Sequence, residues 1–250
     1  MFPYRDENET QRTPFVTLAL IAGTAYVWLA VQGGGAALPL AESVCSLGLI
    51  PGELTGLLPV GTAFDIGDGL ACVTDPGRQP SSVVTSMFLH GSWMHLLGNM
   101  WFLWLFGNNI EDAMSRPRFI AFYLLCGLAA AMAQVWANPA SGVPMVGASG
   151  AISGVMGAYL VLFPRVRVWT MVPLGFFLHS MALPAWVMLI YWAFLQLVGG
   201  LADIGAEGGG VAFWAHVGGF VAGVVLIKLF EREDHLRAHR ARRWQPRRFR

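Results

Sequence analysis

The sequence predicts an all-α membrane protein, a bundle of six transmembrane helices. The first observation is composition: of 250 residues, 55% are apolar and 12% are charged, and the mean hydropathy is +0.54. Most charged residues cluster near the two ends, so the middle of the chain has little polar surface to present to water. This composition excludes an intrinsically disordered chain, and three cysteines are too few for a disulfide scaffold.

The second observation is the length of the apolar segments. A helix of roughly 20 apolar residues crosses about 30 Å of hydrocarbon. Six segments approach this length: Phe15–Gln32, Trp93–Ile110, Phe119–Ala137, Ser149–Phe163, Pro184–Gly200 and Val211–Phe230. The apolar stretch Val168–Ala182 is shorter and contains Pro173 and Gly175, so we expect it to be an interfacial connection and not a seventh span.

The third observation is the distribution of Lys and Arg, which favour cytoplasmic loops. With six spans and both ends inside, 15 of the 16 basic residues are cytoplasmic and Arg78 alone is outside. We therefore expect cytoplasmic tails at residues 1–14 and 231–250 around a membrane domain at residues 15–230, in the plasma membrane. The basic C-terminal tail could bind anionic lipid or nucleic acid. We interpret it as a topology anchor, and we expect the lipid bilayer but no nucleic acid as a partner.

The first outer loop, residues 33–91, is too long for a simple connector. Prolines and glycines, among them Pro51 and Pro59, interrupt its apolar part, which therefore cannot form one spanning helix. We expect short helices lying in the membrane interface. Cys45 and Cys72 both fall in this loop on the oxidising side, where they could form a disulfide.

Polar side chains at membrane depth are costly and call for a functional explanation. Asn99, Ser149 and His216 lie 17, 16 and 12 residues before the first cytoplasmic basic residue that follows each of them. At 1.5 Å per residue, all three lie in the outer half of the bilayer, roughly 5–12 Å below its edge. His95 is four residues before Asn99, so the two share one helix face.

Small residues accompany two of these positions. Ser149 opens its span within the sequence Gly-Ala-Ser-Gly, and a helix start offers unpaired amides and a partial positive charge. His216 is followed by Gly219 and Gly223, a spacing that allows close helix packing. Contact between the fourth and sixth spans would bring His216 within reach of Ser149.

A serine hydroxyl beside an imidazole is a nucleophile beside a general base. No carboxylate lies at this depth, so the pair would act as a dyad, with Asn99 and His95 available to stabilise an oxyanion. Structural roles are the alternative: a helix cap for Ser149, an interhelical hydrogen bond for His216 and an interhelical pair for His95 and Asn99. For His90, near the water boundary, we favour a structural hydrogen bond.

The chain resembles the rhomboid family of intramembrane serine proteases over about Thr85 to Phe230. Three motifs carry the resemblance: His90-x4-His95-x3-Asn99, Gly147-Ala148-Ser149-Gly150 and Ala215-His216-x2-Gly219-x3-Gly223. It implies a six-helix bundle of rhomboid type around a water-filled cavity open to the outside, with no metal or cofactor. The implied nucleophile is Ser149, the base is His216, and the oxyanion stabilisers are His95 and Asn99. The implied structural supports are His90, Gly147, Gly150, Gly219 and Gly223.

Two departures from the family pattern affect the site. Many rhomboids carry a Trp-Arg pair shortly before the second span, where this chain has Ser81 and Ser82. Some carry a Tyr four residues after the nucleophile, where this chain has Ser153, so the orientation of His216 must depend on other neighbours.

The expected function is hydrolysis of peptide bonds in transmembrane or juxtamembrane segments of other proteins, which would be its substrates and partners. A non-catalytic rhomboid-like protein that escorts membrane helices is the alternative. A small transporter or channel fits less well, because it would place ionisable groups across the whole bilayer.

Overall fold

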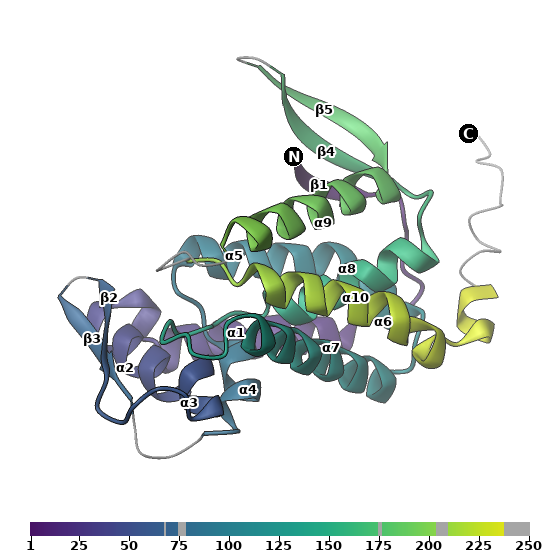
Figure 1. The fold of residues 1–250 in the computed structure, drawn as a ribbon. Helices are drawn as coiled ribbons and strands as arrows, with labels where there is room; N and C mark the ends of the chain where they lie inside the picture. Colours follow the sequence, from purple (N-terminus) through teal and green to yellow (C-terminus); the bar gives the residue numbers. More distant parts are fainter. Residues whose placement is uncertain (68, 75–78, 175–176, 204–209, 238–250) are drawn as a thin grey trace.

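The computed structural model describes residues 1–67, 69–74, 79–174, 177–203 and 210–237 (Figure 1). The chain is mainly helical, and a helix lies at each of the six predicted positions. These are α1 Phe15–Ala30, the run from α5 Trp93–Phe102 to α6 Asn108–Asp112, α7 Arg116–Ala137, α8 Ser149–Leu162, α9 Ala185–Ala202 and α10 Phe213–Phe230. Most of the predicted basic tail, residues 238–250, lies outside the described residues.

Within the described part of the chain, α7, α9 and α10 are long and apolar enough to cross a membrane. Shorter apolar helices are α1, α2 Ala37–Leu47 and α8. The run between Trp93 and Asp112 is continuous, but its middle turn, η3 Leu103–Gly107, is π-helical. Ser92 caps the start of this run, because its hydroxyl accepts a hydrogen bond from the His95 amide at 3.1 Å.

The prediction of an all-α fold is incomplete, because the described residues also form five strands. β1 Phe2–Asp6, β4 Arg167–Leu174 and β5 Phe177–Pro184 make an antiparallel sheet in the order β1-β4-β5. The stretch predicted as an interfacial connection is thus a hairpin, which projects from the bundle beside α9 (Figure 1). Apolar residues lie on both faces of its strands, so no regular alternation marks them as strands.

The N-terminal residues are packed against the bundle and do not form a free tail. The ring of Phe2 stacks on Trp101 at 5.9 Å, and the indole N–H of Trp101 donates to the Pro3 carbonyl at 2.8 Å. The Asp6 carboxylate accepts hydrogen bonds from the Tyr159 hydroxyl at 2.6 Å and the Asn109 amide at 2.9 Å. These contacts fix β1 to α6 and α8.

The segment between α1 and α5 folds into short helices and a hairpin. The helices are α2, α3 Pro51–Thr55 and α4 Ser82–Thr85, and the hairpin is β2 Ala63–Gly67 with β3 Leu70–Val73. Cys45 on α2 and Cys72 on β3 form the disulfide that the sequence allowed, with Cα atoms 5.3 Å apart. Leu49 and Met145 exchange two backbone hydrogen bonds, which join this segment to the chain entering α8.

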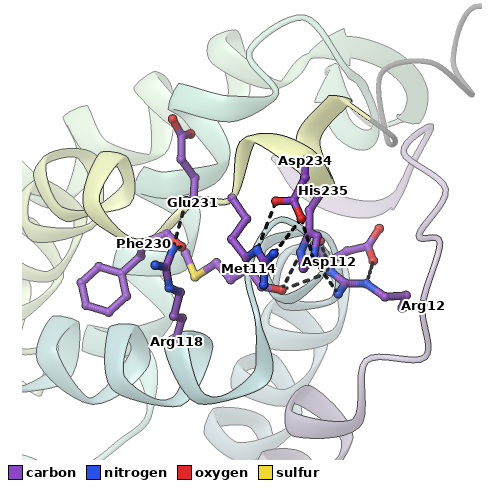
Figure 2. A network of polar contacts seen from close by, with 9 residues as sticks. Arg12, Asp112, Met114, Arg118, Phe230, Glu231, Asp234 and His235 are labelled. Carbon is purple, nitrogen blue, oxygen red and sulfur yellow. Dashed lines mark hydrogen bonds and ion pairs between the residues drawn. The ribbon is translucent and has the colours of Figure 1, made fainter.

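At the end of the bundle where α10 terminates, polar contacts connect three distant parts of the chain (Figure 2). Arg12 forms an ion pair with Asp112 at 3.0 Å and donates to the Met114 carbonyl at 3.1 Å. A guanidinium nitrogen of Arg12 also lies 2.9 Å from a ring nitrogen of His235. The N-terminal segment, the α6–α7 turn and the residues after α10 are therefore held together.

The neighbouring Glu111 caps the N-terminus of α1. Its buried carboxylate accepts hydrogen bonds from the amides of Val16 and Thr17, at 3.0 and 2.8 Å, and from the Thr17 hydroxyl at 2.8 Å. Amides at a helix start have no partner within the helix, so an anion from another helix stabilises them.

Replacing Glu111 with alanine should destabilise the protein by about 3 kcal/mol, because it leaves two amides buried without an acceptor. The measurement is thermal unfolding in detergent. The control is Glu111→Gln, which retains one carbonyl acceptor and should lose less stability. Equal melting temperatures for wild type and Glu111→Ala would contradict this role.

Candidate functional site

The first turn of α8 and the first turn of α10 bring Ser149 and His216 into contact. The Ser149 hydroxyl oxygen lies 2.8 Å from His216 Nε2, a hydrogen-bond distance between residues 67 positions apart. Both side chains are half-buried, so the pair is neither sealed in the core nor fully exposed. Close approach of α8 and α10 makes this contact possible.

Glycines line the seam between α8 and α10. A Cβ atom on Gly219 would lie 2.0 Å from the Gly150 carbonyl oxygen, and one on Gly223 would lie 1.9 Å from the Gly154 carbonyl oxygen. On Gly150, a Cβ atom would lie 2.6 Å from the Cβ atom of Ala130 on α7. No other residue type fits here unless the helices move apart.

Gly147 leaves space for the His95 ring beside Ser149. Its φ angle is +127°, which L-residues rarely adopt, and a Cβ atom there would lie 2.7 Å from His95 Nε2. The same added atom would be 3.6 Å from the Ser149 hydroxyl oxygen. His95 therefore lies near the serine, as the sequence predicts.

Asn99 lies one helical turn after His95 on α5 and is 7% exposed. Its Nδ2 atom has no hydrogen-bond partner among the described residues. A buried donor without a partner is unfavourable unless another molecule supplies the acceptor. The structure gives Asn99 no hydrogen bond to Ser149 or His216 within the described chain.

His90 is fully buried at the entrance to α5. Gln32, at the end of α1, donates to the His90 carbonyl and accepts from the His90 amide, both at 2.8 Å. The His90 ring meets the His95 ring edge-on, with centroids 5.0 Å apart. The position of His90 therefore supports the placement of His95.

Two residues of α9 contact His216 and were missed in the sequence analysis. The Gln196 amide oxygen lies 2.7 Å from His216 Nδ1, and the Trp192 ring packs on the imidazole with centroids 5.8 Å apart. Gln196 is the one carboxamide in an otherwise apolar helix, and that polar residue at membrane depth was the signal available. Trp192 gave no signal, because aromatic residues are common in such helices.

Gln134 on α7 supports the start of α10 in the same region. Its amide oxygen accepts a hydrogen bond from the Ala215 amide at 3.2 Å, next to His216. This amide has no partner within α10, because it lies in the first turn of the helix. Contacts from α7, α8 and α9 thus fix the position of the imidazole.

A small cavity of about 20 Å³ lies beside the serine. Its walls come from α7, α8, α10, the chain before α8 and the segment leading into α5, and they include Gly127, Ala130, Ser149 and Gly150. A cavity of this size holds about one water molecule or one methyl group.

The fold and the hydrogen bond between Ser149 and His216 define the class of protein. It is a helical membrane protein in which a serine hydroxyl is hydrogen-bonded to an imidazole between the helices. A family model described as the Rhomboid domain matches residues 77–233. The chain belongs to the rhomboid family.

Curated relatives agree with this family. Rhomboid protein 1, mitochondrial, from Saccharomyces cerevisiae is 30% identical over 172 residues, which cover 65% of this chain and 46% of that protein. Rhomboid-like protease 5 from Toxoplasma gondii is 31% identical over 167 residues, 65% of this chain and 17% of that protein. The human presenilin-associated rhomboid-like protein, mitochondrial, is 30% identical over 125 residues, 46% of this chain and 33% of that protein. The aligned part thus spans less than half the length of each relative.

Proposed function

We propose that this chain is an intramembrane serine endopeptidase that cleaves transmembrane or juxtamembrane segments of other proteins with a Ser149–His216 dyad. The observation that carries the proposal is the 2.8 Å hydrogen bond between the Ser149 hydroxyl and His216 Nε2. A serine hydroxyl attacks a carbonyl only when a base accepts its proton. The imidazole is placed to do so.

In the proposed reaction, Ser149 attacks the scissile carbonyl carbon and His216 takes the hydroxyl proton. The tetrahedral intermediate collapses, and His216 gives this proton to the leaving amine. A water molecule then donates a proton to His216 and attacks the acyl-enzyme. His216 returns this proton to the Ser149 oxygen as the second product leaves, which restores the serine.

The negative charge on the tetrahedral intermediate needs hydrogen-bond donors that are already in place. The candidates are the Ser149 amide at the start of α8, the Asn99 side-chain amide and the His95 ring. Asn99 supports this proposal because its buried Nδ2 atom has no partner among the described residues. A substrate oxygen would supply the acceptor.

We propose that all six helices cross the bilayer, with both termini cytoplasmic and the site open to the outer side of the plasma membrane. The distribution of basic residues supports this orientation. The disulfide between Cys45 and Cys72 supports it as well, because that segment would lie on the oxidising side.

The proposed substrates have segments that unwind easily, because a helix hides its carbonyl groups in hydrogen bonds. Gly, Pro, Ser and Ala near the outer interface lower the cost of unwinding. The cavity beside Ser149 would receive the substrate side chain next to the cleaved bond. Its volume of about 20 Å³ limits that side chain to about the size of a methyl group.

A single-span substrate with alanine next to the cleaved bond should therefore be cut at least about 10-fold faster than the same substrate with phenylalanine there. The measurement is the rate of product formation by wild-type protein in liposomes. A third substrate, with phenylalanine five residues away, controls for the overall change in hydrophobicity. Faster cleavage of the substrate with phenylalanine next to the cleaved bond than of the alanine substrate would contradict the size limit.

The same liposome assay tests the function itself. Cleavage by the wild type that is lost in Ser149→Ala supports the protease. Cleavage that persists in Ser149→Ala would remove the proposed nucleophile. Binding of the substrate with no cleavage by the wild type would favour a non-catalytic escort of membrane helices.

A further inference from the structure

We infer that Gln196 is a positioning residue that holds His216 in the tautomer required of a general base. The inference rests on the proposed function. A carbonyl oxygen can only accept a hydrogen bond, so the 2.7 Å contact places a proton on His216 Nδ1. In the neutral ring, Nε2 then carries the lone pair, and Nε2 is the atom that faces Ser149 at 2.8 Å.

The same hydrogen bond acts during the reaction. When His216 accepts the serine proton, the ring becomes an imidazolium, and its Nδ1–H bond to Gln196 strengthens. An amide dipole stabilises this charge without carrying one itself. A carboxylate at the same place would have to be kept ionised within an apolar helix, which is costly.

Two contacts from α9 together determine the orientation of the ring. Trp192, one turn before Gln196, packs on the imidazole, and Gln196 binds its Nδ1 atom. The position on α8 one turn after Ser149 is Ser153, whose hydroxyl donates to the Ser149 carbonyl at 2.6 Å. Helix α9 therefore supplies the orientation of His216.

The test compares Gln196→Met with Leu195→Met, a matched change at the adjacent exposed residue. Methionine is close to glutamine in size, and its thioether sulfur is only a weak acceptor for the Nδ1–H group. In Gln196→Met we expect kcat for a single-span substrate to fall about 10-fold with KM unchanged, because only the base is affected. Labelling of Ser149 by a fluorophosphonate should slow by the same factor. Leu195→Met should behave as the wild type.

Gln196→Glu gives a readout that a purely structural role would not move. It retains an acceptor, so its kcat should exceed that of Gln196→Met. Wild-type kcat in Gln196→Met, or a kcat in Gln196→Glu no higher than in Gln196→Met, would overturn the inference while leaving the protease intact. A wild type that neither cleaves nor becomes labelled would overturn the proposed function, and the role of Gln196 with it.

Discussion

Replacing Ser149 with alanine is expected to reduce cleavage of a single-span substrate by roughly 10⁴-fold or more. His216→Ala should cause a loss of similar size, because the hydroxyl that lies 2.8 Å from its ring would have no base. The double variant should be no slower than either single variant, since the two side chains act as one unit. The measurement is the initial rate of product formation in liposomes.

Thermal unfolding serves as the control for these variants. Both side chains are half-buried, so neither substitution should unfold the protein. A fluorophosphonate should label the wild type and fail to label Ser149→Ala. Independent losses that multiply in the double variant would contradict a shared proton transfer.

The second large effect is expected at the glycine seam. A Cβ atom at Gly219 would lie 2.0 Å from a backbone oxygen of α8, so Gly219→Ala forces α8 and α10 apart by roughly 1 Å. A misplacement of this size costs about 10²-fold in rate. We expect cleavage to fall by at least that factor, measured in the same assay.

Gly23→Ala on α1 is the matched control, because an added Cβ atom there has nothing within 4 Å. It should keep wild-type activity. Full activity in Gly219→Ala would mean that the helices tolerate the separation, and the proposed need for close packing would be wrong.

The sequence was sufficient to place the helices and to bring Ser149 and His216 together, because both follow from local rules. Apolar length determines where helices lie, and the glycines at 150, 219 and 223 allow two of them to touch. Counting residues from the cytoplasmic charges gave three polar groups a common depth. The structure places two of these groups in direct contact.

The remaining features depend on contacts between distant segments. The pairing of β1 with β4 joins residues about 165 positions apart, and Phe2–Asp6 carries no strand signal of its own. Gln196 shares no motif with His216, so only the packing of α9 on α10 reveals their hydrogen bond. Glu111 directly follows the predicted span Trp93–Ile110, and nothing in the sequence indicates that its two amide partners belong to α1.

The hydrogen bonds at the two ends of α1, with Glu111 and with His90, determine how much of this protein can fold alone. The family match begins at residue 77, yet within it His90 relies on Gln32 for both of its backbone hydrogen bonds. Glu111 likewise relies on amides that precede the match. A fragment that begins at residue 77 would bury the Glu111 carboxylate and the backbone groups of His90 without these hydrogen-bond partners. The autonomous folding unit is therefore larger than the region by which the family is recognised.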